Sequence, residues 1–158
     1  MIPEGEWLTG AIHLKSNVNL HAAEGAYVHF IEDLEAYLPV VLVRHEGVEA
    51  YNYSPLIYAR DVENVAITGK GVFDGKWPFW QKWAVAAQGS VSHGNRDHAA
   101  TLPLEQRDCG KGAGKEGMSP NFVVMLNAKN VLVEGPTFKD GPMWNIHPVY
   151  CEKAFTMA

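Results

Sequence analysis

The sequence predicts an all-β protein built as a solenoid of short strands, and three observations support this prediction. An Asn-Val pair followed by an alternating and then an aliphatic residue occurs three times, in residues 16–20, 63–67 and 129–133. Alternation of this kind is typical of a strand with one buried face. The copies lie 47 and 66 residues apart. A rung of roughly 20–25 residues would fit these intervals about two and about three times.

The asparagine that opens each copy predicts the corner of a rung. Asparagine tolerates left-handed backbone and can hydrogen-bond to neighbouring backbone groups. We therefore expect Asn17, Asn64 and Asn130 at equivalent corners. A fourth copy would begin at Lys153, 23 residues after Asn130, but Lys-Ala stands there in place of Asn-Val. The sequence pattern is broken at that point.

Other short β-rich runs are separated by Gly, Pro, Asn or Asp, as expected for many short strands without intervening helices. They are residues 25–30, 40–44, 55–58, 71–73 and 122–126. The alternative is a β-sandwich in which the Asn-Val copies arose by chance. Repetition at a near-constant period favours the solenoid.

One segment departs from the strand pattern and reads as an insertion within a single domain of residues 1–158. Apolar residues recur at helical spacing between Trp77 and Gln88, with Pro78 suited to a first turn. Residues 76–118 as a whole read as this helix plus a long loop. The Trp80 and Trp83 stripe favours a core role over a carbohydrate platform.

Composition excludes several classes of function. The net charge of −5 offers no basic face for nucleic acid. No apolar run approaches the ~20 residues of a membrane span, and no signal peptide is recognisable. Cys109 and Cys151 could form at most one bridge, and their spacing predicts no metal site. We expect no cofactor.

Several longer segments together carry a family resemblance. They are residues 2–10, 14–20, 54–58, 64–75, 130–135 and 141–148, the last reading Gly-Pro-Met-Trp-Asn-Ile-His-Pro. The chain resembles glycoside hydrolase family 28, the polygalacturonases and related pectin-degrading enzymes. The resemblance implies a right-handed parallel β-helix and hydrolysis, with inversion, of α-linked galacturonides in pectic oligo- or polysaccharide. The family is usually secreted or periplasmic, and the compartment of this chain stays open.

The catalytic motifs of that family do not occur here. Its carboxylates lie in an Asn-Thr-Asp and an Asp-Asp string, followed by Gly-His-Gly and Arg-Ile-Lys, and none of the four is present. The resemblance therefore implies the N-terminal rungs of a hydrolase, inactive alone, with no catalytic residue in this chain. An uncapped last rung would also favour self-association. A non-catalytic carbohydrate-binding module is the alternative. A calcium-dependent lyase would need clustered carboxylates, and only Glu32-Asp33 stand together.

The candidate substrate-binding residues are Trp144, Asn145 and His147, which the resemblance places near a groove. Aromatic rings stack on sugars, and Asn and His hydrogen-bond to hydroxyls or carboxylates. In the competing interpretation Trp144 fills the interior and His147 is a satisfied rung residue. Asp140 precedes a Gly-Pro turn and reads as a turn former. The cations that could contact an anionic sugar, each with solvated surface charge as the alternative, are Arg44, Arg60 and Lys139. The resemblance would place a tryptophan at His45.

Overall fold

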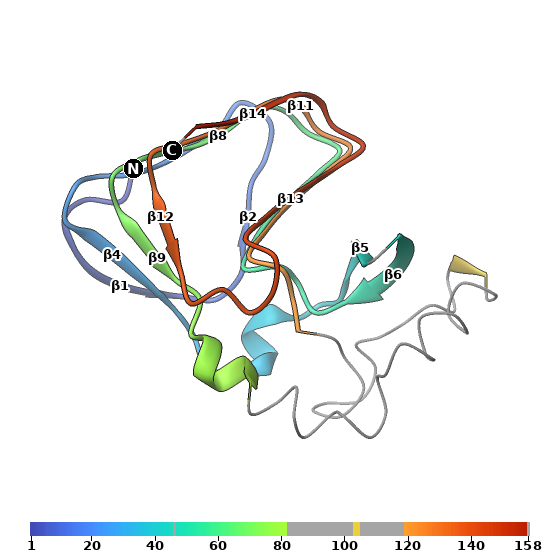
Figure 1. Ribbon diagram of the computed structural model, residues 1–158, viewed down its shortest axis with the longest axis horizontal. Helices are drawn as coiled ribbons and strands as arrows, with labels where there is room; N and C mark the ends of the chain where they lie inside the picture. The colour runs from blue at the N-terminus through green and yellow to red at the C-terminus, as the bar shows by residue number, and fades with distance from the viewer. Residues whose placement is uncertain (46, 82–102, 105–118, 158) are drawn as a thin grey trace.

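The protein is a parallel β-helix. The computed structural model describes residues 1–45, 47–81, 103–104 and 119–157. Figure 1 looks along the coil, so that successive turns overlie one another around a triangular cross-section. Each turn, or rung, gives one strand to each of three parallel four-stranded sheets. The expected all-β, right-handed parallel β-helix is confirmed.

The twelve rung strands fall into the three sheets as follows. Sheet 1 contains β1 (Gly5–Thr9), β4 (Ala26–Phe30), β9 (Val72–Asp74) and β12 (Thr137–Lys139). Sheet 2 contains β2 (Ile12–His13), β7 (Ile57–Arg60), β10 (Val123–Leu126) and β13 (Ile146–Val149). Sheet 3 contains β3 (Asn19–Ala22), β8 (Glu63–Gly69), β11 (Lys129–Glu134) and β14 (Glu152–Met157).

The interior is a column of apolar side chains supplied by alternate strand positions. In β8 and β11 the inward residues are Val65 and Ile67, paired in register with Val131 and Val133. All four are buried. Because like residues stack at the strand spacing of about 4.8 Å, each rung buries its apolar face against the next. The Asn-Val copies are therefore the strands of sheet 3, as their alternation predicted.

The predicted asparagine corners exist, but the rung count inferred from their spacing was wrong. Asn64 Nδ2 donates to Asn17 Oδ1 at 2.9 Å, and Asn130 Nδ2 donates to Asn64 Oδ1 at 2.9 Å. β3 pairs directly with β8, and β8 with β11. The intervals of 47 and 66 residues are therefore one rung each rather than two and three.

Insertions between sheets 1 and 2 account for the extra length of these two rungs. The second rung carries the short 3-10 helix η1 (Leu34–Tyr37) and an antiparallel hairpin of β5 (Val41–His45) and β6 (Val48–Asn52). The strand predicted over residues 40–44 therefore belongs to this hairpin and to no rung. In the third rung residues 77–81 are helical. In Figure 1 the hairpin and this helical turn lie outside the triangular coil.

The helical turn is held to the coil by Trp80. Its side chain is fully buried, contacts Tyr37 edge-on at 5.1 Å between ring centroids, and donates from Nε1 to Gly75 O at 2.9 Å. Trp80 is thus a core residue. The remainder of the helix predicted to Gln88, with Trp83, lies outside the described residues, as does most of segment 76–118.

The fourth rung keeps the register although its corner lacks asparagine. β14 pairs with β11 from Lys129↔Glu152 to Glu134↔Met157. Lys153 has φ 53, close to the 52 of Asn130, so the fourth corner has the same left-handed backbone. The broken sequence pattern therefore does not break the coil. Within the described residues no helix has the length and apolar character needed to span a bilayer.

Candidate functional site

The outer face of sheet 2 carries a row of side chains that crosses all four rungs and includes the candidate His147. In-register pairing places His13 beside Tyr58, Tyr58 beside Val124, and Val124 beside His147. Their inward neighbours Ile57 and Val123 belong to the main core, so these four side chains face outward. His147 therefore lies on an outer face.

The β5–β6 hairpin covers the middle of this outer face. A second apolar cluster, separate from the interior, joins Val41 and Leu42 of β5 to sheet 2, where it includes Tyr58, Val124, Leu126 and Val149. Tyr58 fixes the hairpin further by donating from its hydroxyl to Leu42 O at 2.7 Å. The hairpin thus separates His13 at one end of the row from His147 at the other.

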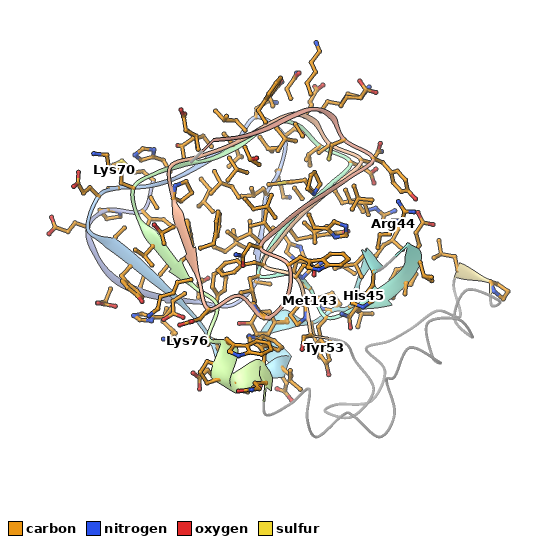
Figure 2. All side chains as sticks on the ribbon, in the orientation of Figure 1. Arg44, His45, Tyr53, Lys70, Lys76 and Met143 are labelled. Atoms are coloured by element: carbon orange, nitrogen blue, oxygen red, sulfur yellow. The ribbon has the colours of Figure 1, made fainter. Side chains whose placement is uncertain are left out.

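Three aromatic side chains meet on the His147 side of the hairpin. Trp144 is 41% exposed and stacks on His45 of β5, with ring centroids 6.0 Å apart and an interplanar angle of 15°. His147 meets Trp144 edge-on at 4.7 Å. We call these three residues, with Arg44 and Asn121 beside them, the Trp144 cluster. Figure 2 shows Arg44 and His45 on the hairpin, outside the coil.

Asn121 orients the imidazole of His147. Its side-chain amide nitrogen lies 3.1 Å from His147 Nδ1 and donates to it in the tautomer that carries its proton on Nε2. Asn121 is only 5% exposed, and its Oδ1 is buried without a hydrogen-bond partner. Burial lowers the pKa of His147 below its usual range, and the charges of Arg44 and His45 lower it further. The ring is therefore neutral at pH 7 and presents an Nε2–H donor.

Arg44 supplies a positive charge to the cluster. Its guanidinium carbon lies 5.2 Å from the centroid of the Tyr150 ring, a cation–π geometry. Arg44 makes no ion pair with any carboxylate in the described part of the chain. A guanidinium that packs on an aromatic face still has N–H donors in its plane that can hydrogen-bond to both oxygens of a carboxylate ligand.

The other sequence candidates lie elsewhere. Asn145 is exposed, and its Oδ1 lies over Gly141, where a Cβ atom would approach it to 2.3 Å. Asp140 is at a corner with φ 51, and its Oδ2 lies 3.6 Å from Lys139 Nζ. Arg60 lies on the far side of the hairpin, where Nε donates to Asp61 at 3.0 Å. The structure brings together Trp144, His147 and Arg44 and leaves the others outside.

Sequence reasoning missed Asn121 and Tyr150, and His45 drew attention only as a departure from the family pattern. His45 reaches Trp144 because the hairpin folds back over β10 and β13, and no short motif signals that contact. Asn121 and Tyr150 flank β10 and β13 directly, so only knowledge of the rung register could have placed them.

A second polar group occupies the outer face of sheet 1, which lies across the coil from the hairpin in Figure 1. His29 Nε2 contacts a carboxylate oxygen of Glu6, and His29 Nδ1 lies 3.6 Å from Asp74 Oδ2. Lys76 Nζ is 2.9 Å from the same oxygen. No three His, Cys, Asp or Glu side chains of the described residues are grouped so as to hold a metal ion.

Three solved structures are similar to this chain. The crystal structure of a hyperthermoactive exopolygalacturonase from Thermotoga maritima is 45% identical with a TM-score of 0.86, over 98% of this chain and 37% of that one. A family 28 exopolygalacturonase from Yersinia enterocolitica is 21% identical with a TM-score of 0.60, over 95% of this chain and 30% of that one. A protein from Parabacteroides merdae ATCC 43184, provisionally named a glycosyl hydrolase, is 21% identical with a TM-score of 0.63, over 97% of this chain and 57% of that one. No protein-family model and no curated protein matches the chain.

The fold is a parallel β-helix similar to that of the Thermotoga exopolygalacturonase. The likeness at 45% identity confirms the resemblance seen in the sequence. The chain belongs to glycoside hydrolase family 28, and it spans 37% of the length of the Thermotoga enzyme.

Proposed function

We propose that this chain forms the saccharide-binding wall of a pectin-degrading glycoside hydrolase and does not hydrolyse the polymer by itself. The observation that carries the proposal is the exposed ring of Trp144, held between His45 and His147 with Arg44 beside it. The exopolygalacturonase from Thermotoga maritima, at 45% identity, is the precedent for the substrate class.

The chemistry of the Trp144 cluster suits a sugar acid. An exposed indole offers an apolar face to the C–H side of a pyranose ring, and its neighbours restrict its rotamers before ligand arrives. The Arg44 fork matches the two oxygens of a uronate carboxylate. The neutral His147 ring donates from Nε2 to a hydroxyl.

Hydrolysis needs two carboxyl groups, one to protonate the leaving oxygen and one to activate water. Asp140, which lies in the turn leading to Trp144, is exposed and ion-paired to Lys139 at 3.6 Å. Its role in this proposal is to form the turn. A non-catalytic saccharide-binding module uses the same cluster and the same contacts.

Binding is tested by titrating the chain with trigalacturonate and following tryptophan fluorescence and calorimetry. We expect saturable binding that Trp144→Ala weakens at least tenfold, a loss of about 1.4 kcal/mol. Trp7→Ala is the matched control, since Trp7 is 43% exposed and lies on sheet 1. Absence of binding at millimolar ligand, or equal loss in both variants, refutes saccharide binding at the Trp144 cluster.

Catalysis is tested separately with polygalacturonate and a reducing-end assay. We expect no release of reducing ends above the buffer blank. Release that is abolished in Asp140→Asn, while trigalacturonate binding is retained, would show that this chain is a hydrolase in its own right.

A further inference from the structure

A second concave site lies at the opposite end of the sheet 2 outer face, on the first two rungs. It is a pocket of about 370 Å³ whose lining combines apolar surface with several polar and charged groups; its residues are His13, Leu14, Lys15, Ser16, Tyr58, Arg60 and Val62. This volume is at the small end of the range for small-molecule sites. The hairpin and three strand spacings of about 4.8 Å, or roughly 14 Å, separate it from His147.

Two positive charges stand side by side in this pocket. Leu14 N donates to Tyr58 O at 2.8 Å, so the chain continues alongside β7 beyond the His13↔Tyr58 pair, and both Lys15 and Arg60 line the pocket. Like charges held close together repel each other unless an anion lies between them. Lys15 has no ion-pair partner among the described residues, and Arg60 contacts Asp61 through Nε alone. The Arg60 side chain also hydrogen-bonds to the Tyr58 side chain, so the Lys15 ammonium is the charge left wholly for an anion, with the Arg60 guanidinium beside it in the same pocket.

The remaining lining supplies hydroxyl partners and ring faces. His13 and Tyr58 pack edge-on with centroids 5.3 Å apart. His13 Nε2 lies 2.8 Å from Ser54 Oγ, so Nδ1 remains for a ligand. Burial lowers the pKa of His13, and burial raises the pKa of Tyr58 to about 12, so both rings are neutral at pH 7. Ser16 Oγ accepts from Glu63 N at 3.1 Å and retains its own proton as a donor.

We propose that this pocket is a second binding site, specific for a small hydroxylated carboxylate of the sugar-acid class. Lys15 and Arg60 bind the carboxylate, and His13 and Ser16 bind hydroxyls against the Tyr58 ring. The proposal does not depend on binding or hydrolysis at the Trp144 cluster. The carboxylate belongs either to a free monosaccharide acid or to the end residue of an acidic oligosaccharide.

The test is an amide ¹H–¹⁵N titration of the whole chain with galacturonate, with neutral galactose as the matched ligand. We expect galacturonate to shift the resonances of residues 13–16 and 58–62, and galactose to bind at least tenfold more weakly. Lys15→Gln and Arg60→Gln should each weaken galacturonate binding tenfold or more, the usual scale for a hydrogen bond to a charged group. Lys70→Gln is the control, because Figure 2 shows Lys70 on the far side of the coil from the hairpin.

Two further readouts distinguish the sources and the sites. Bound carboxylate should raise the pKa of His13, followed through its ring protons. If the natural ligand is a free monosaccharide acid, digalacturonate should bind more weakly than galacturonate. If the ligand is the end residue of an oligosaccharide, digalacturonate should bind equally or more tightly. Trp144→Ala should leave all these values unchanged. Galacturonate binding that survives both pocket substitutions, or shifts confined to the Trp144 cluster, overturns this proposal without touching the function proposed for that cluster.

Discussion

The side-chain amide of Asn130 donates a 2.9 Å hydrogen bond to the side-chain oxygen of Asn64, which lies one rung away and 66 residues earlier in the chain. Asn64 repeats the contact to Asn17, 47 residues earlier, also at 2.9 Å. All three residues have left-handed backbone, with φ of 52, 55 and 64. Asparagine serves both needs of the corner, since it tolerates this backbone and carries a donor and an acceptor.

Asn64→Ala should destabilise the protein by about 2–3 kcal/mol. It removes two side-chain hydrogen bonds, each worth about 1 kcal/mol, and forces alanine into a left-handed backbone at a cost of about 1 kcal/mol. Equilibrium urea unfolding measures the loss. Asn64→Gly removes the same bonds without the backbone strain and should cost about 1 kcal/mol less than alanine. Equal losses of unfolding free energy in Asn64→Ala and Asn64→Gly would show that backbone strain does not contribute to the cost of the alanine variant.

Lys153→Asn should stabilise the fourth rung. Lys153 has φ 53 and lies at the corner after Asn130, so asparagine there can extend the ladder by one bond and relieve the strained lysine backbone. We expect a gain of about 1–2 kcal/mol in urea unfolding. Lys153→Gly separates the two effects, since glycine relieves strain alone. A gain from glycine that equals the gain from asparagine would argue against an added hydrogen bond.

The asparagine corners and the strands of sheet 3 could be predicted from the sequence because both depend on local chemistry. The Asn-Val copies encode a left-handed turn followed by an alternating strand, and neither feature needs distant residues. No sequence pattern predicted a second side-chain hydrogen bond between corners of neighbouring rungs, in which Asn127 Nδ2 donates to Asp61 Oδ1 at 2.6 Å. Asp61 and Asn127 are followed by different residues, Val62 and Ala128, so no repeated string marks them.

The rung count and the site were beyond sequence reasoning for a different reason. Spacing alone cannot distinguish two rungs of ordinary length from one rung with an insertion, and both long intervals proved to be the latter. The same insertion carries His45 and Arg44 to Trp144. Contacts across about 100 residues of sequence depend on the register of the coil, which no local pattern records.

Arg44→Met should raise the pKa of His147. Burial is the largest cause of its lowered pKa, and removing the Arg44 charge leaves burial in place, so we expect a partial return toward the usual value near 6.5. Titration of the His147 ring protons by NMR measures the shift. Lys70→Met removes a distant charge and should leave the His147 titration unchanged. An unchanged pKa in Arg44→Met would place the guanidinium away from the imidazole in solution.

The lowered pKa of His147 also predicts a pH dependence of stability. Because the unfolded chain binds this proton at higher pH than the folded chain, the free energy of unfolding falls as pH drops below about 6.5 and stops falling once the folded pKa is passed. His147→Gln should reduce this slope. His13 contributes in the same direction through its own lowered pKa, so some slope must remain. The urea midpoint measured between pH 7 and 5 in both proteins tests the difference.

Asp74 should contribute to stability through its charge. Its burial acts to raise the pKa, but the hydrogen bonds and charge of Lys76 outweigh burial, and the net pKa lies below the usual 3.8. Asp74→Asn should cost about 1.5–3 kcal/mol near pH 7, the scale of hydrogen bonds to a charged group. A depressed folded pKa means that this contribution is present above pH 3.8 and is lost as pH falls through the folded value.

The gap between wild type and Asp74→Asn should therefore narrow as urea unfolding is repeated from pH 5 down to pH 2. Glu24→Gln is the matched control, since Glu24 is exposed and pairs with Lys70 at 3.4 Å on the surface. Exposed pairs contribute about 0–1 kcal/mol, so this variant should differ little from wild type throughout. If the difference in unfolding free energy between wild type and Asp74→Asn stays constant down to pH 2, the charge of Asp74 does not matter and its side chain contributes through packing. In that case Lys76→Met, which keeps the carboxylate and removes its main partner, should leave the protein as stable as wild type.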